Sequence, residues 1–186
     1  MARRLKPGDH IEARSLTDIA GRLVALPDPA QTVHLQFRRF AGCPICNLHL
    51  RSFVRRLSEI EAAGVREIAV FHSTAEEMRR YESDLPFTTI GDPDKRLYRA
   101  FSVEAAPRAL LDPRVLPGIL RGVAAATVES IRRGKLMGNT NPHGGRIGLP
   151  ADFLIAPDGR VRAAKYGAHA DDQWSVDEML ALAREA

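Results

Sequence analysis

The spacing of apolar residues divides the first half of the chain into two strands and a long helix. Apolar residues at every second position predict a strand over 32–38. Beyond Pro44 the apolar residues recur with a helical period, and Gly64 marks the expected end of this helix. The run EIAVF at 67–71 is continuously apolar, which is typical of a parallel strand buried on both faces.

The middle of the chain continues this alternation of helix and strand. Ser73 followed by Glu76 forms a capping-box pattern, which predicts the start of a short helix. The apolar run FTTI at 87–90 predicts a third strand. A further helix is expected to have Pro93 at its first position, where proline costs no hydrogen bond.

The two ends of the chain and its third quarter add smaller elements. Turn residues interrupt short apolar pieces over 8–26, which predicts an N-terminal β element. A long apolar stripe predicts a helix over 113–133. The turn sequence PDGR between two apolar runs predicts a β-hairpin over 151–166, and Ser175 is the expected cap of a last helix.

This order of elements predicts an α/β protein. Crossover helices between strands, followed by a closing hairpin, imply a mixed sheet covered on both faces. We therefore expect a three-layer α/β/α sandwich with an N-terminal β element and a helical insertion over 104–146 before the final hairpin. With 186 residues, of which 45% are hydrophobic and 27% charged, the chain suits a single domain over 1–186.

The charge pattern excludes some function classes. The formal net charge is +4, but the arginines are scattered and accompany no nucleic-acid-binding motif, so no nucleic-acid partner is expected. No apolar run reaches the length of a membrane span, and no apolar run follows the basic start as in a secretory signal. We expect a cytoplasmic protein with no membrane partner, in a compartment that keeps thiols reduced.

The two cysteines of the chain, Cys43 and Cys46, lie three positions apart at the start of a predicted helix. Residues at this spacing on a helix face each other, close enough for a disulfide. The helix N-terminus favours a thiolate at Cys43, and Arg39 or Arg38 from the preceding strand can strengthen this effect. We expect Cys43 to attack a substrate and Cys46, which is expected to be the less exposed, to resolve. Pro44 suits the first helical turn.

Two alternatives remain open for this pair. The cysteines can be inert small hydrophobes in a core. They can also hold zinc together with some of His49, His72 and His143, although one pair without a second is weak support for a metal site. The redox scheme requires no metal and no organic cofactor. A separate cluster of His169 with neighbouring acids can bind a metal, but it is more typical of a solvated loop.

Four segments carry a resemblance to a known family. VHLQFRRFAGCPICNLHL resembles the cysteine-bearing strand and helix of the thioredoxin-fold superfamily. GDPDKRLYRAFSV and GLPADFLIAPDGRVRAAKYG are similar to the peroxiredoxin-like branch, the alkyl hydroperoxide reductase and thiol-specific antioxidant family, and LKPGDHIEARSLTDIAGRLVAL fits its N-terminal hairpin. The resemblance implies a thioredoxin-like fold and leaves only residues 104–146 unmatched.

The resemblance also implies site features, and the chain departs from two of them. It implies a cis-proline facing the cysteines, for which Pro150 is the matching position. The family places Thr or Ser three residues before its reactive cysteine, where this chain has Phe40. It places an arginine where this chain has Pro150, so Arg146 or Arg108 would have to substitute. These departures favour dithiol–disulfide exchange relative to fast peroxide reduction.

The sequence therefore predicts a thiol-dependent oxidoreductase. Cys43 attacks a peroxide or a disulfide, Cys46 closes the Cys43–Cys46 bond, and a thioredoxin or a low-molecular-weight thiol reopens it. The residues expected to carry this chemistry are Cys43, Cys46, Pro150 and Arg39. The alternative is a redox-sensing binding module without turnover. The apolar stripe of the 113–133 helix is expected to be core, with a homodimer contact as the second interpretation.

Overall fold

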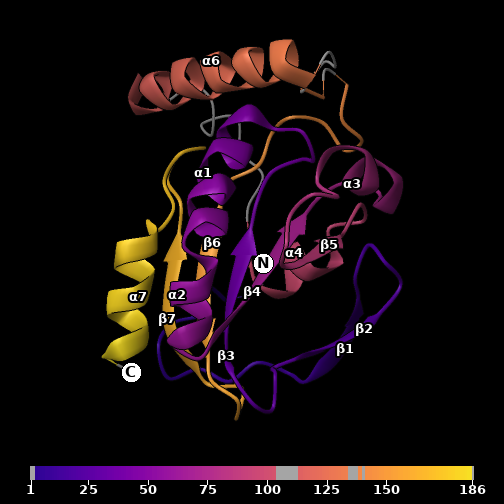
Figure 1. Ribbon diagram of the computed structural model, residues 1–186. Helices are drawn as coiled ribbons and strands as arrows, with labels where there is room; N and C mark the ends of the chain where they lie inside the picture. The colour runs from indigo at the N-terminus through magenta and orange to yellow at the C-terminus, as the bar shows by residue number, and fades with distance from the viewer. Residues whose placement is uncertain (1–2, 104–112, 134–137, 140, 186) are drawn as a thin grey trace.

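The computed structural model describes residues 3–103, 113–133, 138–139 and 141–185. A five-stranded sheet of order β5-β4-β3-β6-β7 forms its centre (Figure 1). Strands β3, β4 and β5 are parallel, whereas β6 and β7 are antiparallel to their neighbours, so the predicted mixed sheet is confirmed. The strands are β3 (Thr32–Phe37), β4 (Val65–Phe71), β5 (Thr88–Gly91), β6 (Ala151–Ile155) and β7 (Val161–Tyr166).

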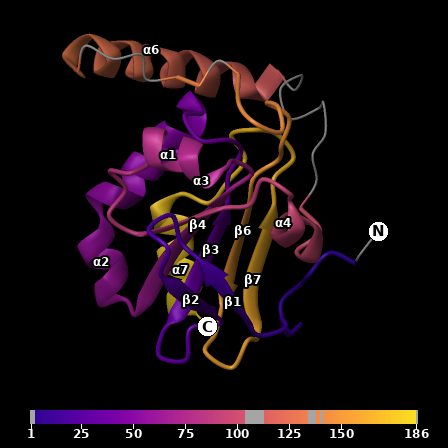
Figure 2. The same cartoon turned by 90° about the vertical axis from the view of Figure 1, so that its right-hand side faces the viewer.

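Helices cover both faces of this sheet and complete the predicted α/β/α sandwich. The described helices are α1 (Pro44–Arg55), α2 (Leu57–Ala62), α3 (Ala75–Tyr81), α4 (Arg96–Ala100), the short 3₁₀ turn η1 (Pro113–Val115), α6 (Leu116–Arg133) and α7 (Val176–Arg184). One face packs against α1, α2, α3 and α7, and the other against α4 and an N-terminal hairpin (Figures 1 and 2).

The N-terminal hairpin confirms the predicted β element. It pairs β1 (Arg14–Thr17) with β2 (Leu23–Leu26) in antiparallel register. Val24 and Leu26 point into the main core. The backbone N–H of Ile19 donates to the carbonyl of Thr89 at 3.1 Å, so the connection of the hairpin partly covers the outer edge of β5.

The alternating pattern of β3 places its odd residues in the core with α4. Val33, Leu35 and Phe37 are fully buried there. The aromatic rings of Phe37 and Tyr98 meet edge to face with centroids 4.9 Å apart. On the other face, Trp174 packs with Met179, so it anchors the last helix as its position at the start of that helix suggests.

Helix starts show where the sequence pattern was right and where it was one residue off. The capping box of α7 at Ser175 is confirmed. The box of α3 is formed by Thr74 and Glu77, so the assignment to Ser73 and Glu76 is wrong. The hydroxyl of Ser73 is buried and accepts from the N–H of Ala41 at 3.0 Å, so it is not available as a cap.

Two other helices differ from their predicted bounds. The helix expected to run to Gly64 is broken at Arg56, where φ −116° and ψ 19° leave the helical region and separate α1 from α2. Helix α4 begins three residues after Pro93. The Asp92 carboxylate accepts the N–H groups of Arg96 and Leu97 at 2.9 and 2.8 Å, and this side chain therefore sets the start of the helix.

The long helix predicted over 113–133 is confirmed, with η1 as its first turn and α6 as the rest. Helix α6 lies across the N-terminal end of α1 (Figure 1). Several of its apolar residues are exposed, so the expectation that its stripe is core is wrong for these: Leu116, Leu120, Val123, Val128 and Ile131. The rest of the predicted insertion, at 104–112, 134–137 and 140, lies outside the described residues. A single domain stays a prediction.

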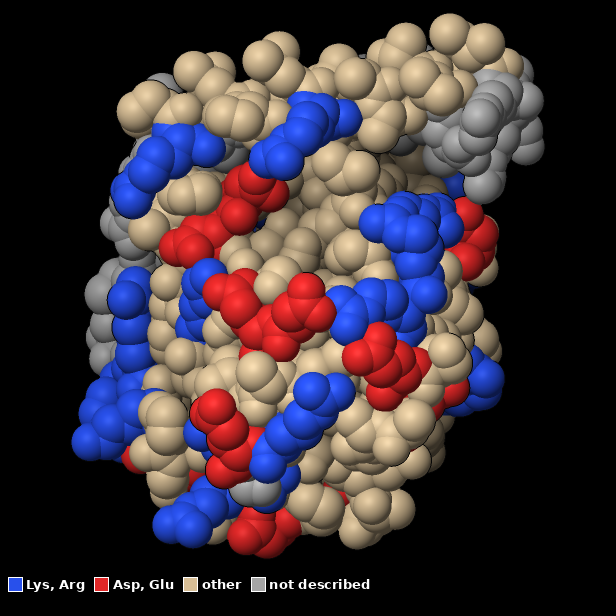
Figure 3. Space-filling view, turned by 60° about the vertical axis from the view of Figure 1, so that its left-hand side comes forward, with Lys and Arg blue, Asp and Glu red and all other residues tan. Residues whose placement is uncertain are grey.

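Figure 3 shows the surface that this arrangement produces. The upper rim, where α6 lies in Figure 1, is a mostly uncharged band. Positive and negative side chains are interspersed on the face below it. This mixture agrees with the scattered arginines of the sequence.

The cis-proline expected at Pro150 is wrong. Among the described residues the only cis peptide bond is Leu26–Pro27. The Pro150 carbonyl accepts the N–H of Gly167 at 2.9 Å, directly beyond the paired residues of β6 and β7. Pro150 thus extends the hairpin ladder with its carbonyl group, and its bond to Leu149 is trans, which is the more stable isomer of an X–Pro bond.

Candidate active site

Cys43 occupies the N-cap position of α1, directly after the loop that leaves β3. Its φ of −70° and ψ of 117° are extended, and Pro44 forms the first turn of the helix. Its carbonyl accepts the N–H of Asn47 at 2.9 Å, as an N-cap carbonyl should. The Cys43 thiol therefore lies at the positive end of α1, where unpaired N–H groups favour negative charge.

Both cysteines are free thiols, and both are buried. Cys43 is 1% exposed and Cys46 is 2% exposed, so the expectation that Cys46 is the less exposed is wrong. They share an apolar cluster with Phe40 and Ile45, and Ile119 of α6 packs against it. The helix that the sequence left unmatched thus helps to cover both thiols.

Arg39 is the arginine that lies beside the thiol. Its Nη1 lies 3.5 Å from Sγ of Cys43, and its guanidinium carbon lies 5.2 Å from the centroid of the Phe40 ring. Its Nη2 donates to the backbone carbonyl of Arg146. Arg39 is itself almost fully buried, so its charge acts on Cys43 with little screening by water.

The surroundings give the two thiols opposite tendencies to ionise. Burial alone would raise the pKa of the Cys43 thiol. The hydrogen bond from the Cys46 thiol and the Arg39 charge outweigh this effect, and backbone N–H groups at the start of α1 add to them, so that the pKa of Cys43 falls to about 6. The same hydrogen bond and burial raise the pKa of Cys46 well above its ordinary value. At neutral pH, Cys43 is a thiolate and Cys46 a thiol.

A cavity of about 310 Å³ opens next to Cys43. Phe40 and Pro44 form one side of it, and Ile119 and Val123 of α6 form another. Asn139, Gly138 and the two arginines Arg39 and Arg146 complete its lining. The cavity is small and mostly apolar, with its charged groups near the thiol, which is the composition of a small-molecule site.

The loop that contributes to this cavity is held by one carboxylate. Oε1 of Glu77 accepts the side-chain amide of Asn139 at 3.0 Å and the backbone N–H of His143 at 2.9 Å. The N–H of Asn139 also donates to the carbonyl of Gly42 at 3.3 Å. These bonds place the loop, and with it the Arg146 carbonyl that orients Arg39.

Arg38 points to the opposite side of β3 and belongs to a buried polar network that the sequence did not reveal. Its Nη2 lies 2.7 Å from Asp152 of β6. His34 has its Nδ1 2.9 Å from Glu67 of β4 and its Nε2 3.4 Å from Asp152. Gln36 donates to Glu67 and accepts from Arg38. All of these side chains are buried.

The charges of this network are balanced. Burial lowers the pKa of His34, but the carboxylates of Glu67 and Asp152 outweigh burial and raise it to about 9. Burial raises the pKa of Asp152, but Arg38 and His34 hold it well below its usual range. Two cations therefore face two carboxylates below the cysteine helix.

The histidines that the sequence offers as zinc ligands have other surroundings. His49 lies 3.3 Å from Arg38, and burial together with that charge holds its pKa well below its ordinary value. His72 is 1% exposed between the rings of Phe40 and Tyr98, and burial with the Lys95 charge lowers its pKa to about 4. Across the described ranges, no group of three or more His, Cys, Asp or Glu is placed to hold a metal.

The acids near His169 form a closed turn. Asp172 accepts the N–H of Ala168 at 2.8 Å and pairs with Lys165 at 2.9 Å. Asp171 donates its backbone N–H to Nδ1 of His169 at 3.3 Å. These bonds account for the acids without a metal, but Ala170 is buried and Asp171 and Asp172 are half-buried, so the expectation of a solvated loop is wrong.

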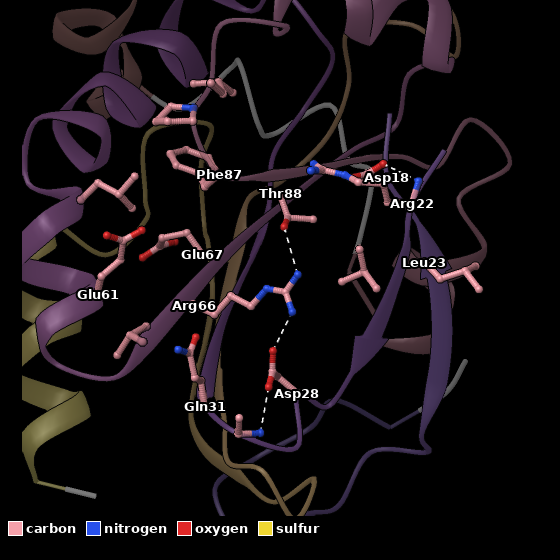
Figure 4. Close-up of a pocket in the computed structure, with 16 residues that line it drawn as sticks. Asp18, Arg22, Leu23, Asp28, Gln31, Glu61, Arg66, Glu67, Phe87 and Thr88 are labelled. Carbon is pink, nitrogen blue, oxygen red and sulfur yellow. Dashed lines mark hydrogen bonds and ion pairs between the residues drawn. The ribbon is translucent and has the colours of Figure 1, made fainter. Parts of the chain in front are cut away.

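A second cavity, of about 710 Å³, lies at the other end of the sheet (Figure 4). Its lining includes Val65 and Arg66, the first residues of β4, whereas Cys43 follows the last residue of the parallel strand β3. Arg66 pairs with Asp28 at 2.6 Å and reaches Thr88 at 3.4 Å, as the dashed lines in Figure 4 show. Its cation is thus already paired, and this cavity is separate from the cysteine site.

Comparison with solved structures supports the fold. The peroxidoxin BcpB from Mycobacterium tuberculosis matches with a TM-score of 0.67 at 17% identity, covering 98% of each chain. A cysteine-to-serine mutant of peroxiredoxin 6 from Arenicola marina matches with a TM-score of 0.68 at 13% identity, covering 97% of this chain and 72% of that chain. A Chlorobium tepidum protein, provisionally assigned as the thiol:disulfide interchange protein DsbE, matches with a TM-score of 0.59 at 20% identity, covering 96% and 99%.

These structural likenesses show a shared thioredoxin-type fold. A search of curated protein sequences found no match. None of the helices in the described part of the chain is long and apolar enough to cross a bilayer. A family model, that of the AhpC/TSA family, matches residues 7–164, which include both cysteines and the whole five-stranded sheet apart from the last residues of β7. The chain therefore belongs to the AhpC/TSA family.

Proposed function

We propose that this protein is a dithiol oxidoreductase that reduces a small peroxide at Cys43. The observation that carries the proposal is the position of the Arg39 guanidinium, 3.5 Å from a Cys43 thiol at the start of α1. A thiolate is the reactive form of cysteine, and a nearby cation stabilises both the thiolate and the negative charge that develops on the leaving oxygen.

The reaction divides into three steps. The Cys43 thiolate attacks the terminal oxygen of a hydroperoxide, the O–O bond breaks, and the leaving alkoxide takes up a proton to become an alcohol. Cys43 is then a sulfenic acid, and the Cys46 sulfur displaces its hydroxyl as water to form the Cys43–Cys46 disulfide. Two equivalents of an external thiol, from a thioredoxin or a low-molecular-weight thiol, return both cysteines to thiols.

The shape of the site favours a small substrate. Cys43 is 1% exposed, and the cavity beside it is about 310 Å³. An extended protein segment that carries a disulfide needs a long groove, whereas a small peroxide fits a cavity of this size, with a mostly apolar lining and charged groups near the thiol. The family places an arginine where this chain has Pro150. Arg39 supplies the positive charge at the thiol in place of that arginine.

The cis-proline that would shape a docking surface for a disulfide substrate is not present at Pro150. This weakens the support for exchange with protein disulfides. Reduction of Cys43–Cys46 by a partner thiol then requires that α6 or residues 141–148 give access to the pair. A reducing compartment such as the cytoplasm would supply either reductant.

Stopped-flow mixing of the reduced protein with hydrogen peroxide, with an organic hydroperoxide and with a model disulfide tests the proposal. We expect a peroxide reaction far faster than that of free cysteine, half-maximal near pH 6 and lost in Cys43→Ser. Intact mass should show the loss of two hydrogens in the wild type. In Cys46→Ser the mass should instead increase by one oxygen. Rates equal to free cysteine with both peroxides would refute the proposal.

One observation favours a second candidate, a redox-sensing binding module. Helix α6 packs on the cysteine cluster through Ile119 and also carries exposed apolar residues, so oxidation at Cys43 can alter a surface that is available to another protein. The same stopped-flow experiment separates the candidates when an excess of reductant is present. An enzyme consumes peroxide over many turnovers, whereas a module reacts once.

A further inference from the structure

Glu82 is a fully buried acid directly behind the reactive cysteine. It follows the last residue of α3 and has no exposed surface. Its Oε1 accepts the backbone N–H of Gly42 at 2.7 Å. Because Gly42 immediately precedes Cys43, this hydrogen bond fixes the backbone that presents the thiol to α1.

There is no room for a side chain at Gly42. Its φ of 78° is in the left-handed region, and a Cβ atom there would lie 2.9 Å from the backbone nitrogen of Asn139. Glu82 therefore contacts a tightly packed loop, and the position of its carboxyl group relative to Cys43 is well defined.

The side-chain amide of Asn47 is a second polar partner of Glu82, and it can form hydrogen bonds with either the ionised or the protonated carboxyl group. With its nitrogen toward Glu82, the side-chain amide of Asn47 donates to both carboxyl oxygens, at 2.8 and 3.1 Å. With its oxygen toward Glu82, the amide can only accept, and a protonated carboxyl can then donate to it. Rotation of one amide by half a turn thus satisfies both the acid and the carboxylate.

The charged groups that face Glu82 favour the protonated state while Cys43 is a thiolate. Burial raises the pKa of Glu82 to about 8, against the Gly42 N–H, which lowers it; the charges of Cys43 and Asp84 raise it further, and Arg51 lowers it. Arg51 is itself paired with Asp84 at 2.6 Å, so these two charges largely offset each other. The charge of Cys43 is the one that changes during the reaction.

We propose that Glu82 is a positioning residue that holds a proton while Cys43 is a thiolate and releases it when Cys43 is oxidised. Oxidation removes the negative charge from Cys43, whether the product is the sulfenic acid or the disulfide. The Glu82 carboxyl can then ionise beside the Gly42 N–H and the Asn47 amide. Glu82 releases one proton, and the leaving alkoxide takes up one proton, so the first step proceeds without net proton uptake by the protein and its products. This role rests on the proposed redox cycle of Cys43.

The reduction equilibrium of the Cys43–Cys46 pair tests this role. Reduction takes up one proton at Cys46, and a second at Glu82 if Glu82 is ionised only in the oxidised protein. One additional proton makes the equilibrium constant about tenfold more sensitive to each pH unit. Redox titration of the wild type in thiol buffers between pH 6 and pH 9, corrected for ionisation of the buffer thiol, should show this dependence below about pH 8.

Glu82→Gln is the test variant because glutamine keeps an acceptor for Gly42 but cannot ionise. We expect its pH dependence to be shallower by up to about tenfold per pH unit. Glu76→Gln on the exposed side of α3 is the matched control and should behave as the wild type. Identical pH dependence in the wild type and Glu82→Gln would overturn the proposal. A purely structural role would alter stability but not this slope.

The wild type alone provides a second measurement if Glu82→Gln does not fold. Infrared difference spectra between reduced and oxidised protein should show the loss of a protonated carboxyl band on oxidation. A spectrum without this change would also overturn the proposal. Neither measurement requires peroxidase activity, since thiol buffers set the redox state. A protein that fails to reduce peroxide but shows the Glu82 effect would refute the proposed function and leave this inference standing.

Discussion

Gly122 of α6 lies against the backbone of Ile45, at the first turn of the cysteine helix. A Cβ atom at Gly122 would be 3.0 Å from the Ile45 nitrogen and 3.0 Å from the Pro44 carbonyl carbon. Only a residue without a side chain lets the two helices approach this closely. The cover over Cys43 and Cys46 therefore depends on one glycine, in the segment over 104–146 that the sequence alone left unmatched.

Gly122→Val should move α6 away from α1 and expose Cys43. Overpacking at a close contact typically costs about 1–3 kcal/mol, and α6 can relieve it by shifting. We expect faster alkylation of Cys43 by a bulky reagent at pH 8, where the thiolate is fully formed. Ala124→Val adds a side chain of the same size on the exposed side of α6 and is the control. Equal alkylation rates in the two variants would contradict this arrangement.

Arg39→Met should slow the reaction of Cys43 in two ways. Loss of the guanidinium raises the pKa of the thiol from about 6, so less thiolate is present at neutral pH. It also removes the cation that stabilises the leaving oxygen, an effect of about 100-fold for one donor in other active sites. Peroxide consumption and the pH profile of alkylation measure the two effects separately. Arg22→Met, at an exposed arginine, is the control and should change neither the rate of peroxide consumption nor the pH profile of alkylation. A similar loss of rate in both variants would mean that the net charge of the protein, and not the position of Arg39, causes the effect.

Cys46→Ala should raise the pKa of Cys43 even though no charge is removed. The hydrogen bond from the Cys46 thiol is the strongest of the interactions that lower that pKa. We expect the midpoint of Cys43 alkylation to move upward by about one pH unit, which corresponds to about 1.4 kcal/mol for one hydrogen bond to a charged group. An unchanged midpoint would mean that Arg39 and the helix N-terminus are sufficient. Cys46→Ser should restore part of the shift because serine can donate to Cys43.

The sequence predicted what local patterns encode and missed what distant residues decide. Some elements have an apolar pattern that repeats every few residues along the chain, so periodicity was enough to predict them. They are β3, the helix from Pro44, the long helix over 113–133 and the closing hairpin. His34, Gln36 and Arg38 occupy the polar positions of the predicted strand, and the alternation does not show what they contact on a sheet covered on both faces. They are buried because their partners Glu67 and Asp152 come from strands 33 and 114 residues away.

The residues of the candidate site also divide into those that the sequence predicted and those that only the structure shows. Cys43 and Cys46 stand out because their spacing at a helix start is visible in one dimension. Glu82 looks like an ordinary acid at the end of a short helix, and only its packing against Gly42 shows its importance. The family pattern assigns the cis-proline to Pro150, but the Pro150 carbonyl pairs with Gly167, a residue whose position depends on the register of the hairpin.

Asp152→Asn should destabilise the fold strongly. Asp152 is the partner of both Arg38 and His34, and all three side chains are fully buried. Removal of one partner from a buried charge network leaves an uncompensated cation and typically costs about 3–5 kcal/mol. Urea unfolding of Asp152→Asn measures this cost. The double variant with Arg38→Met should recover part of it, since the unpaired cation is then gone; additive losses in the double variant would contradict direct pairing.

His34 should make the stability of the protein decrease as the pH rises. Its pKa is about 9 in the folded protein and about 6.5 when unfolded, so the folded state binds the additional proton between these values. This contribution, on the order of 3 kcal/mol, is complete below about pH 6.5 and is lost as the pH rises through about 9.

Cys43 acts in the opposite direction over part of the same range, because its pKa of about 6 lies below the value in the unfolded chain. The effect of His34 is therefore measured by comparing His34→Gln with its parent, and both proteins should carry Cys43→Ser. In that background the free energy of unfolding, measured in urea at pH 6, 7, 8 and 9, should fall more steeply in the parent than in His34→Gln. Parallel curves would show that His34 is not protonated between Glu67 and Asp152, and the balanced charges of the buried network would then need another cation.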